Sequence, residues 1–252
     1  MIILKSRQEI ASISRACRIV AEALEEIKGL IKPGTTTAEI DNLVEGFIRK
    51  KGGVPAFKGY RGFPNSICTS INEQVVHGIP SDRKLIEGDI ISLDLGVIID
   101  GYYGDAAVTF PVGEVSLKAL RLLKVTEASL YAGIEKAIIG NRVSDISCAI
   151  QTLVEKEGFS VVRDFVGHGI GRYLHEEPQI PNFGEAGQGA RLKEGMTLAI
   201  EPMVNAGDYR TTLLNDKWTA VTVDGELSAH FEHTIAVTSD GPLILTKCEM
   251  IW

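Results

Sequence analysis

The sequence is short of several features that mark special classes of protein. None of its apolar runs is long enough to cross a bilayer, and Met1 to Lys5 do not lead into the long apolar stretch and small-residue cleavage site of an export signal. Aromatic residues make up 6% of the 252 residues, and 26 Lys and Arg are outnumbered by 33 Asp and Glu, which leaves a formal net charge of −7. A chain with this acidic balance is not expected to track phosphates. These absences predict a globular protein of the cytoplasm, with no membrane segment and no direct nucleic-acid function.

The cysteines do not form any pair with the spacing Cys-x-x-Cys; they lie at positions 17, 68, 148 and 248. A zinc ribbon, a dithiol redox motif and a disulfide framework are therefore not expected. The chain also lacks a low-complexity linker that would divide it. Since a domain commonly holds roughly 100 to 200 residues, the length fits one large domain or two fused halves.

Hydrophobic spacing and capping residues predict four helices. Apolar residues recur at intervals of three and four from Ile10 to Ile31, and Ser6 with Glu9 forms a capping box at the start of this helix. A second helix is expected from about Thr36 to the glycines at 52 and 53, and two others over 116–139 and 144–157. Runs rich in β-branched residues predict strands over 89–99, 102–112, 196–204, 218–223 and 230–237. This mixture indicates a fold of the α/β (α+β) class.

The two halves of the chain resemble each other. Three positions in and next to the second predicted helix recur 106 residues later, with Gly34, Ile40 and Gly52 matched by Gly140, Ile146 and Gly158. The segment 84–88 recurs 107 residues later as 191–195, and the same register places Asp94 on Glu201. Ordered matches of this kind indicate an internal duplication. We therefore expect residues 1–252 to form a single domain, with α/β halves of roughly 1–125 and 126–252 related by pseudo-twofold symmetry around a shared cleft.

A hairpin is predicted to bring two aspartates together. Asp100-Gly101 between two β-rich runs is typical of a two-residue type I′ turn, because both central residues must adopt positive φ. In that register Asp94 pairs with Ala107, and Asp105 lies on the same face as the diagonal neighbour of Asp94, about 7 to 8 Å away. Like charges held this close raise each other's pKa unless a cation lies between them. The hairpin alone fits two solvated aspartates equally well.

Two carboxylates of the second half favour the cation. Glu201 ends the apolar run 196–200, and Glu232 begins another apolar run at 232–237. Buried carboxylates are costly unless they are paired or bound to metal. His168, between two glycines, offers a single nitrogen donor beside these oxygen donors. Several carboxylates with one imidazole suit manganese, iron or cobalt, and bridging carboxylates favour two ions that share a hydroxide and perform hydrolysis.

Eight segments, in order, carry a resemblance to a known family. They are Ser70–Glu73, Val76–Pro80, Asp94–Gly96, Gly104–Asp105, Gly167–Gly171, His175–Pro178, Glu201–Met203 and Phe231–Thr234. Through them the sequence resembles the methionine aminopeptidases of the first type over nearly its whole length. The resemblance implies the pita-bread fold, in which two pseudo-twofold-related α/β halves surround a central curved antiparallel sheet and the helices lie outside. It also implies that the single domain is catalytic.

The activity implied by the resemblance is that of a metal-dependent aminopeptidase. Such an enzyme removes the N-terminal methionine from nascent proteins and peptides with a small second residue, using a hydroxide that bridges two divalent metal ions. The implied metal ligands are Asp94, Asp105, His168, Glu201 and Glu232. Glu201 would also act as general base and pass a proton to the leaving amine. His175 would steady the oxyanion of the scissile carbonyl, and His77 would reach the scissile nitrogen.

The resemblance also implies a methionine-binding pocket. Its residues would be Phe57, Tyr60, Phe63, Cys68, Leu174 and Trp218, with His77 and His175 beside them. Aromatic rings and a cysteine suit a polarizable thioether. Phe63 stands where a tyrosine is frequent in the family and Leu174 where a phenylalanine is frequent, so the pocket is expected to remain apolar but to differ in shape.

Cofactors and partners follow from the same resemblance. Two divalent ions are expected, with cobalt, manganese and iron as the first candidates and zinc or nickel as further ones. One monovalent cation is expected near Asn72 and Ser228. The partner would be the N-terminus of a peptide or nascent polypeptide, with transient ribosome contact, and the enzyme would act as a monomer in the cytoplasm.

Other functions were weighed against this one. Proline-directed aminopeptidases and dipeptidases share the fold but generally carry a long additional N-terminal domain, whereas here the repeat starts close to residue 1. The second type of methionine aminopeptidase has a helical insertion between the last two glutamates, and only 31 positions separate Glu201 from Glu232. A binding module that had lost its metals should lack one of the ligand-type residues, and all five are present.

Overall fold

The computed structural model describes residues 1–247. Its helices are α1 (Arg7–Ile27), α2 (Thr37–Lys50), α3 (Leu117–Ile134) and α4 (Val143–Lys156), with short 3-10 helices η1 (Lys28–Leu30) and η2 (Tyr60–Gly62). The strands of the first half are β1 (Val54–Pro55), β2 (Cys68–Ile71), β3 (Gln74–Val76), β4 (Ile90–Ile99) and β5 (Tyr102–Pro111). Those of the second half are β6 (Ser160–Val161), β7 (Gly167–Gly169), β8 (Glu176–Ile180), β9 (Thr197–Ile200), β10 (Met203–Asn205), β11 (Thr211–Leu213), β12 (Ala220–Thr222), β13 (Ser228–His230), β14 (Glu232–Thr238) and β15 (Gly241–Ile244).

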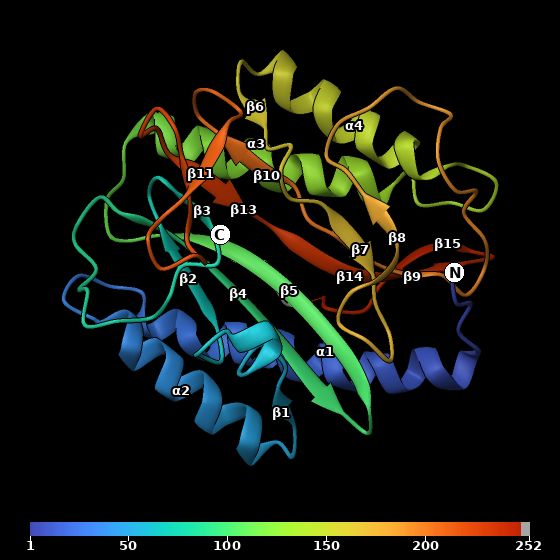
Figure 1. The fold of residues 1–252 in the computed structure, drawn as a ribbon, viewed down its shortest axis with the longest axis horizontal. Coiled ribbons are helices and arrows are strands. Elements are labelled where there is room, and N and C mark those ends of the chain that lie inside the picture. The colour runs from blue at the N-terminus through green and yellow to red at the C-terminus, as the bar shows by residue number, and fades with distance from the viewer. Residues whose placement is uncertain (248–252) are drawn as a thin grey trace.

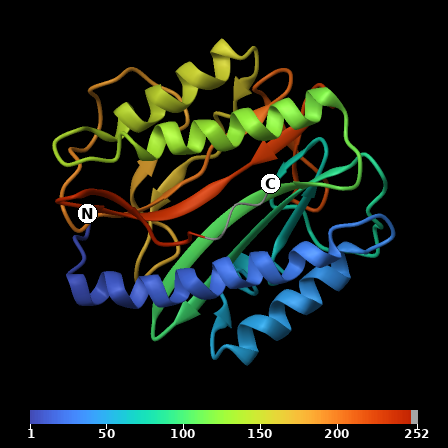
Figure 2. The ribbon, with the colours of Figure 1, turned by 180° about the vertical axis from the view of Figure 1, so that it is seen from behind.

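A curved antiparallel sheet forms the centre of the described part of the chain. Its path runs β1-β4-β5-β14-β9-β7-β8, while β2 also pairs with β4 and β15 with β14. Two three-stranded sheets, β13-β10-β6 and β11-β12-β3, lie beside it. Seen from behind, α1 and α3 lie across one face of the sheet, and the opposite face is left to loops and short strands (Figures 1 and 2). The expected curved antiparallel sheet with outer helices is confirmed.

Local signals set the helix starts. Ser6 and Thr36 each cap a helix with the side chain, and the glutamate three residues later returns the bond to the cap backbone, so both predicted capping boxes are present. The buried face of α1 then packs on β4 and β5. Gly104 permits this contact, because a Cβ there would lie 2.5 Å from the backbone nitrogen of Cys17.

The helix ends differ from the prediction. The first helix was expected to reach Ile31, but the α-helix ends at Ile27 and continues as the 3-10 turn η1. The third was expected to reach residue 139, but α3 ends at Ile134, and backbone turns follow it. Apolar residues continue past both ends, but Ile31 is only half-buried, and after Ala137 the side chains of Ile138 and Ile139 are exposed.

The predicted hairpin register is confirmed in full. Strands β4 and β5 pair Ile99 with Tyr102 at the turn and Asp94 with Ala107 farther along. The two turn residues Asp100 and Gly101 have φ of 50° and 76°, as a type I′ turn requires.

Two predicted strands are interrupted at the same level of the sheet. The run 196–204 was expected to be continuous, but it divides into β9 and β10 around Glu201 and Pro202, and the run 230–237 divides into β13 and β14 at Phe231. The pairing of His233 with Ile200 and of His230 with Met203 belongs to one antiparallel register, so the two strands bend together without a slip. Pro202 has no backbone N–H to donate, which explains why the ladder stops there.

The segments matched by the sequence repeat make equivalent local contacts. An isolated bridge joins Thr36 to Lys84 in the first half, and another joins Arg142 to Arg191 in the second. The backbone N–H of Gly34 donates to the carbonyl of residue 85, and that of Gly140 donates to the carbonyl of residue 192. Both glycines have positive φ, of 94° and 96°.

Candidate metal centre

The candidate ligands lie on the face of the central sheet that α1 and α3 do not cover. They form two neighbouring rows of residues that are paired across the strands. In the first row Asp94 on β4 pairs with Ala107 on β5, and Ala107 pairs with Glu232 on β14. Directly paired residues of an antiparallel sheet point to the same face, so Asp94 and Glu232 flank the small side chain of Ala107 on one face. The pairings of β9 with β14 and of β10 with β13 follow one register, and in that register Glu201 lies opposite Glu232. The two glutamates are at the point where the ladder between these strands is interrupted.

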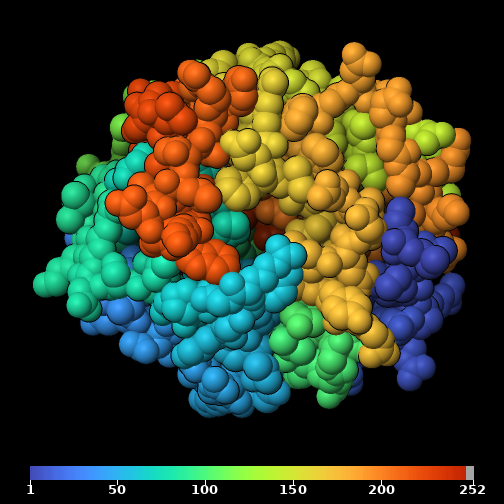
Figure 3. Space-filling model, in the orientation of Figure 1, coloured from blue at the N-terminus to red at the C-terminus, as the bar shows by residue number. Residues whose placement is uncertain are grey.

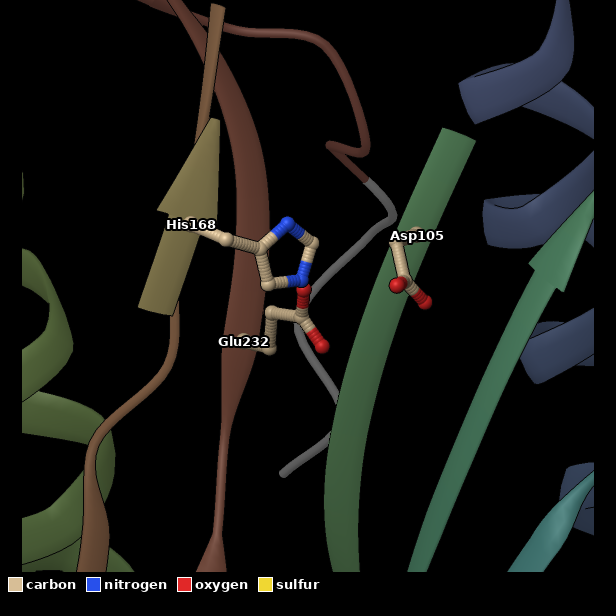
Figure 4. A group of neighbouring side chains, drawn as sticks. All are labelled: Asp105, His168 and Glu232. Atoms are coloured by element: carbon tan, nitrogen blue, oxygen red, sulfur yellow. The ribbon is translucent and has the colours of Figure 1, made fainter. Parts of the chain in front are cut away.

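The second row supplies the other two candidates. Asp105 lies two residues before Ala107 on the same face, and its backbone N–H donates to the hydroxyl of Thr234 over 3.3 Å. Thr234 pairs with Ala199 on β9, and Ala199 pairs with His168 on β7. Asp105, His168 and Glu232 have ligand atoms within 4.8 Å of one another, and Figure 4 shows their side chains converging from three strands.

A cavity opens over these rows. In the space-filling view the face is hollowed at its centre, between the loops that follow β1 and β7 and the connection from β11 to β12 (Figure 3). The residues that line the cavity are Phe57, Tyr60, Arg61, Phe63, Cys68, His77, Asp94, Asp105, His168, Leu174, His175, Glu201, Trp218 and Glu232. The structure therefore brings together the five candidate ligands, both candidate catalytic histidines and the six candidate pocket residues.

Several buried atoms of the centre lack a hydrogen-bond partner in the described part of the chain. They are one carboxylate oxygen of Asp94, one of Asp105, one of Glu232, and Nε2 of His230. Burying polar atoms without partners is costly, and a clear reason is needed when several occur side by side. Divalent ions bound among these atoms would supply the missing partners. The residues present therefore fit a metal centre, and their hard oxygen donors with imidazole nitrogen suit first-row divalent ions.

The electrostatics of the centre agree with this fit. Burial is the main cause that raises the pKa of Asp94 to about 7, with His230 opposing the rise and Glu201 adding to it. Burial also raises the pKa of Asp105, Glu201 and Glu232 well above their ordinary values, and Asp94 and Glu201 add to the rise at Asp105. Four acids that resist ionisation in one place need a positive charge between them to become carboxylates near neutral pH.

The rim of the cavity is held differently. His175 is stacked on Tyr60, with ring centroids 5.3 Å apart, and the Tyr60 hydroxyl lies 2.8 Å from Nδ1 of His175. Burial, and then the charge of Arg61, lowers the pKa of His175 to about 4. Burial likewise lowers the pKa of His77 to about 4, so both imidazoles are neutral at pH 7.

A buried ion pair fixes the loop that carries His175. Lys5 Nζ contacts Glu176 at 2.5 Å, and both side chains are almost fully buried. The other oxygen of Glu176 accepts the backbone N–H groups of Arg172 and Tyr173 at 2.8 and 3.2 Å. Glu176 thus closes the turn 172–176, and the position of His175 follows from it.

An apolar cluster, separate from the main core, forms the remaining wall. It contains Ala56, Phe57, Phe63, Cys68, Ile170 and Leu174, with Tyr60, Ile79, Ile98, Tyr103 and Trp218 packed against it. Phe63 and Trp218 meet edge to face with centroids 5.2 Å apart. Such a wall can accept a flexible apolar side chain next to the metal centre.

Two residues of the site were not identified from the sequence. Arg61 lines the cavity from the left-handed turn after Tyr60, where its φ is 50°, and no motif marked it. His230 was overlooked although it precedes Glu232 by two residues, a spacing that places both side chains on one face of a strand. The structure places this second imidazole beside the candidate ligands, with His230 Nε2 3.5 Å from Oε2 of Glu201.

The candidate residues for a monovalent cation lie outside this cavity. The backbone N–H of Ser228 donates to the carbonyl of Asn72 over 2.8 Å, so the two residues are in contact. The Asn72 side chain bonds to Asp89 and to the backbone of Ile90. A cation at this position stays a prediction.

Comparison with known proteins identifies a family. A model described as metallopeptidase family M24 matches residues 11–239. The chain is 57% identical over 247 residues to methionine aminopeptidase 1 of Bacillus subtilis, an alignment that covers 98% of this chain and 100% of the relative. It also superimposes on the crystal structure of methionine aminopeptidase from Rickettsia prowazekii with a TM-score of 0.97 and 46% identity, covering 98% of this chain and 100% of that one.

Proline-specific relatives are more distant. The prolidase of Pyrococcus furiosus gives a TM-score of 0.79 at 25% identity, and the match covers 98% of this chain but 66% of the prolidase. Similarity in both sequence and length therefore favours the methionine-specific relatives. None of the helices among residues 1–247 is long and apolar enough to span a membrane.

Proposed function

The chain belongs to metallopeptidase family M24, and we propose that it is a metal-dependent aminopeptidase that removes the N-terminal methionine from peptides and nascent proteins with a small second residue. Relatives named methionine aminopeptidase match it over almost the full length of both chains. The observation that carries the proposal is one sheet face on which buried carboxylate oxygens and a histidine nitrogen, all without hydrogen-bond partners among residues 1–247, lie beside an apolar pocket.

Asp94, Asp105, His168, Glu201 and Glu232 would hold two divalent ions. When bound, the ions would supply Lewis acidity and lower the pKa of a shared water, so that hydroxide is available near neutral pH. The oxygen-rich donor set supports manganese, iron or cobalt as the first candidates, with zinc and nickel after them.

Glu201 would move the proton of the reaction. Its carboxylate lies between two imidazoles, with Oε1 3.4 Å from His168 Nε2 and Oε2 3.5 Å from His230 Nε2. A carboxylate in this position would accept a proton from the attacking water and deliver it to the leaving amine.

His175 would stabilise the developing negative charge on the scissile carbonyl oxygen. In our proposal the Tyr60 hydroxyl donates to Nδ1 of His175, which leaves the proton on Nε2 as a donor into the cavity. A preorganised donor aimed at developing charge commonly contributes about 2.7 to 4 kcal/mol to the barrier. His77, whose ring lies 6.3 Å from that of Trp218, would contact the leaving side of the scissile peptide.

The apolar cluster would bind the methionine side chain. Phe57, Tyr60, Phe63, Cys68, Leu174 and Trp218 line the same cavity as the candidate ligands. Aromatic edges and a buried thiol make favourable contacts with a thioether. A free α-amino group would then lie next to the metal centre, which makes the proposed enzyme an exopeptidase.

The organisation and partners of the enzyme are also part of the proposal. We propose one catalytic domain, whose two halves arose by duplication, and the equivalent contacts of Gly34 and Gly140 support this. The enzyme would act as a monomer in the cytoplasm on nascent chains, with transient contact to the ribosome, since that is where initiator methionines become accessible. A monovalent cation would lie beside Asn72 and Ser228, where the turn between β2 and β3 meets the start of β13.

Peptide cleavage tests the function directly. Protein stripped with a chelator is supplied with manganese, iron or cobalt, and its activity on Met-Ala and Xaa-Pro peptides is measured in parallel. We expect metal-dependent release of methionine and no cleavage of Xaa-Pro substrates. Cleavage of Xaa-Pro in preference to Met-Ala would contradict the proposed specificity, and activity that does not depend on added metal would contradict the metal centre.

A further inference from the structure

His230 is a buried side chain of the centre that has no role in the proposal so far. It ends β13, and only 1% of it is exposed. Its backbone is fixed on both sides by Thr109, whose hydroxyl accepts the N–H of His230 at 2.9 Å and donates to its carbonyl at 2.8 Å. Because it precedes Glu232 by two residues on nearly continuous strands, its side chain is on the same face as Glu232.

The nitrogen that His230 presents to the centre has no hydrogen-bond partner among the described residues. Nε2 is fully buried, and its nearest recorded contact is Oε2 of Glu201 at 3.5 Å, a distance at which no hydrogen bond is formed. A hydrogen bond that held Glu201 in place would be expected to be shorter, near 2.7 to 2.9 Å, roughly the range of charge-assisted bonds.

His230 and His168 each place Nε2 at a similar distance from a carboxylate oxygen of Glu201. His168 Nε2 lies 3.4 Å from the other carboxylate oxygen of Glu201. Nδ1 of His168 is 2.9 Å from the carbonyl of Gly169, which leaves Nε2 as the ligand atom. Glu201 therefore has one imidazole nitrogen at each of its two oxygens.

Two sets of donors in the centre are compact enough to share an ion each. Asp105, His168 and Glu232 form one set, and Glu201, His230 and Glu232 form the other, with ligand atoms within 4.8 Å of one another in each. Bonds from a divalent ion to imidazole nitrogen or carboxylate oxygen are about 2.0 to 2.2 Å, so shifts of a few tenths of an ångström bring each set around one ion. Glu232 belongs to both sets and can bridge them.

We propose that Nε2 of His230 is a direct ligand of the second divalent ion, so that each ion of the pair binds one imidazole, His168 on one side and His230 on the other. This inference rests on the proposed function and extends its five-residue ligand set to six. Imidazole suits cobalt, nickel and zinc more than manganese, so His230 would shift the preference of the second position towards those metals.

The neighbouring His233 provides a matched control. It is also buried and lies next to Glu232, but it faces the other side of the sheet. Its Nδ1 lies 2.9 Å from the Thr246 hydroxyl, and its Nε2 lies 3.4 Å from the hydroxyl of Tyr131. A histidine whose nitrogens already have partners outside the cavity should not affect metal binding.

The first experiment uses the unaltered protein. Crystals of the chain loaded with two equivalents of cobalt are measured at the cobalt absorption edge, which locates each ion by anomalous scattering. We expect His230 Nε2 at about 2.0 to 2.2 Å from one of two cobalt positions. A separation of more than about 3 Å from both positions, longer than any such bond, would overturn the proposal.

The second experiment measures metal affinity in solution. Calorimetric titration of stripped His230→Gln with cobalt should show the second binding step weakened by about 10- to 100-fold and the first step unchanged, with a smaller loss for manganese. His233→Gln should bind both ions like the unaltered protein. Equal second-step affinities of His230→Gln and the unaltered protein would also overturn the proposal.

The outcome for His230 can be separated from the outcome for the function. The same cobalt-loaded, unaltered protein is tested for release of methionine from Met-Ala peptides. If it is active while His230 is far from both ions, only the extra ligand is wrong. If it is inactive while His230 binds cobalt, the metal assignment stands and the proposed function fails.

Discussion

The metal centre and the rim of the cavity differ in whether their buried polar atoms have hydrogen-bond partners. In the centre, Asp94, Asp105 and Glu232 project from hydrogen-bonded strands, and each has a buried oxygen without a partner in the described chain. At the rim, His175 and Glu176 belong to a loop whose polar atoms bond to Tyr60, Lys5 and backbone N–H groups. The centre is incomplete without a cation, whereas the rim is complete and requires only a substrate.

The titration behaviour of the two regions differs for the same reason. Burial raises the pKa of the acids of the centre, so that without an ion they retain protons at a pH where exposed carboxylates have lost them. Burial lowers the pKa of His77 and His175 at the rim to about 4, so that these groups are neutral throughout the neutral range. Changes in the centre should therefore affect metal and proton binding, and changes at the rim should affect turnover alone.

The largest effect is expected from Glu201→Gln. Replacing the group that would bind an ion and also move a proton should lower kcat for a Met-Ala peptide by about 10⁴-fold or more. Bound metal, measured by elemental analysis after gel filtration, should fall as well, because one carboxylate of the centre is lost. Normal turnover in the variant would remove Glu201 from the mechanism.

His175→Ala should lower turnover without changing metal binding, which would distinguish the role of the rim from that of the centre. We expect kcat to fall by about 10²- to 10³-fold, since one donor to the developing oxyanion is lost. Metal content and cobalt affinity should stay as in the unaltered protein, because His175 is not among the partnerless donors of the centre. Loss of metal in this variant would contradict the division between the two regions.

Metal removal should make the stability of the protein depend on pH in a defined direction. Asp94 releases its proton near its ordinary pKa of 3.8 when unfolded but at about 7 when folded. Above about pH 7, where the histidines are neutral in both states, the acids of the centre still hold protons only in the folded chain, so the free energy of unfolding falls as pH rises, by about 1.4 kcal/mol per pH unit for each such proton. Urea unfolding of stripped protein at about pH 7 and about pH 8 measures this change, because the histidines do not contribute in that range. Saturating manganese should abolish the fall, and greater stability of the stripped protein at the higher pH would contradict it.

Of the four changes predicted here, the substitution Tyr60→Phe should have the smallest effect. It removes the hydroxyl that holds Nδ1 of His175 but keeps the stacked ring. A typical hydrogen bond contributes about 0.5 to 1.5 kcal/mol, so kcat should fall by roughly two- to twelvefold while metal affinity is unchanged. A loss as large as that of His175→Ala would mean that Tyr60 itself contacts the reacting atoms.

Much of the fold could be predicted because its signals are local. The capping boxes at Ser6 and Thr36 and the turn at Asp100-Gly101 are decided by residues within four positions of each other, and all three are present. The hairpin turn then fixed the register that places Asp94 and Asp105 on one face. The helix ends at Ile27 and Ile134 were missed, since apolar spacing does not distinguish a last helical turn from the turns that follow.

The site was predicted less completely, because it depends on contacts between residues that are far apart in the sequence. Arg61 lines the cavity because its loop follows β1, which pairs with the distant strand β4. His230 faces Glu201 only because two strands bend together where Pro202 interrupts the ladder. Arg61 leaves no periodic pattern in the sequence, whereas the two-residue spacing between His230 and Glu232 indicates a shared strand face but not the contact of His230 with Glu201.

The sequence by itself determined the helix starts, the hairpin register and the kinds of donor available, because each depends on hydrogen bonds between residues close along the chain. Only the tertiary structure decided which donors share an ion, because that depends on how β5, β7, β9 and β14 align across separations of up to 129 residues. His168 is a candidate ligand in the sequence already, whereas His230 becomes one only because the sheet places Glu201 between the two imidazoles.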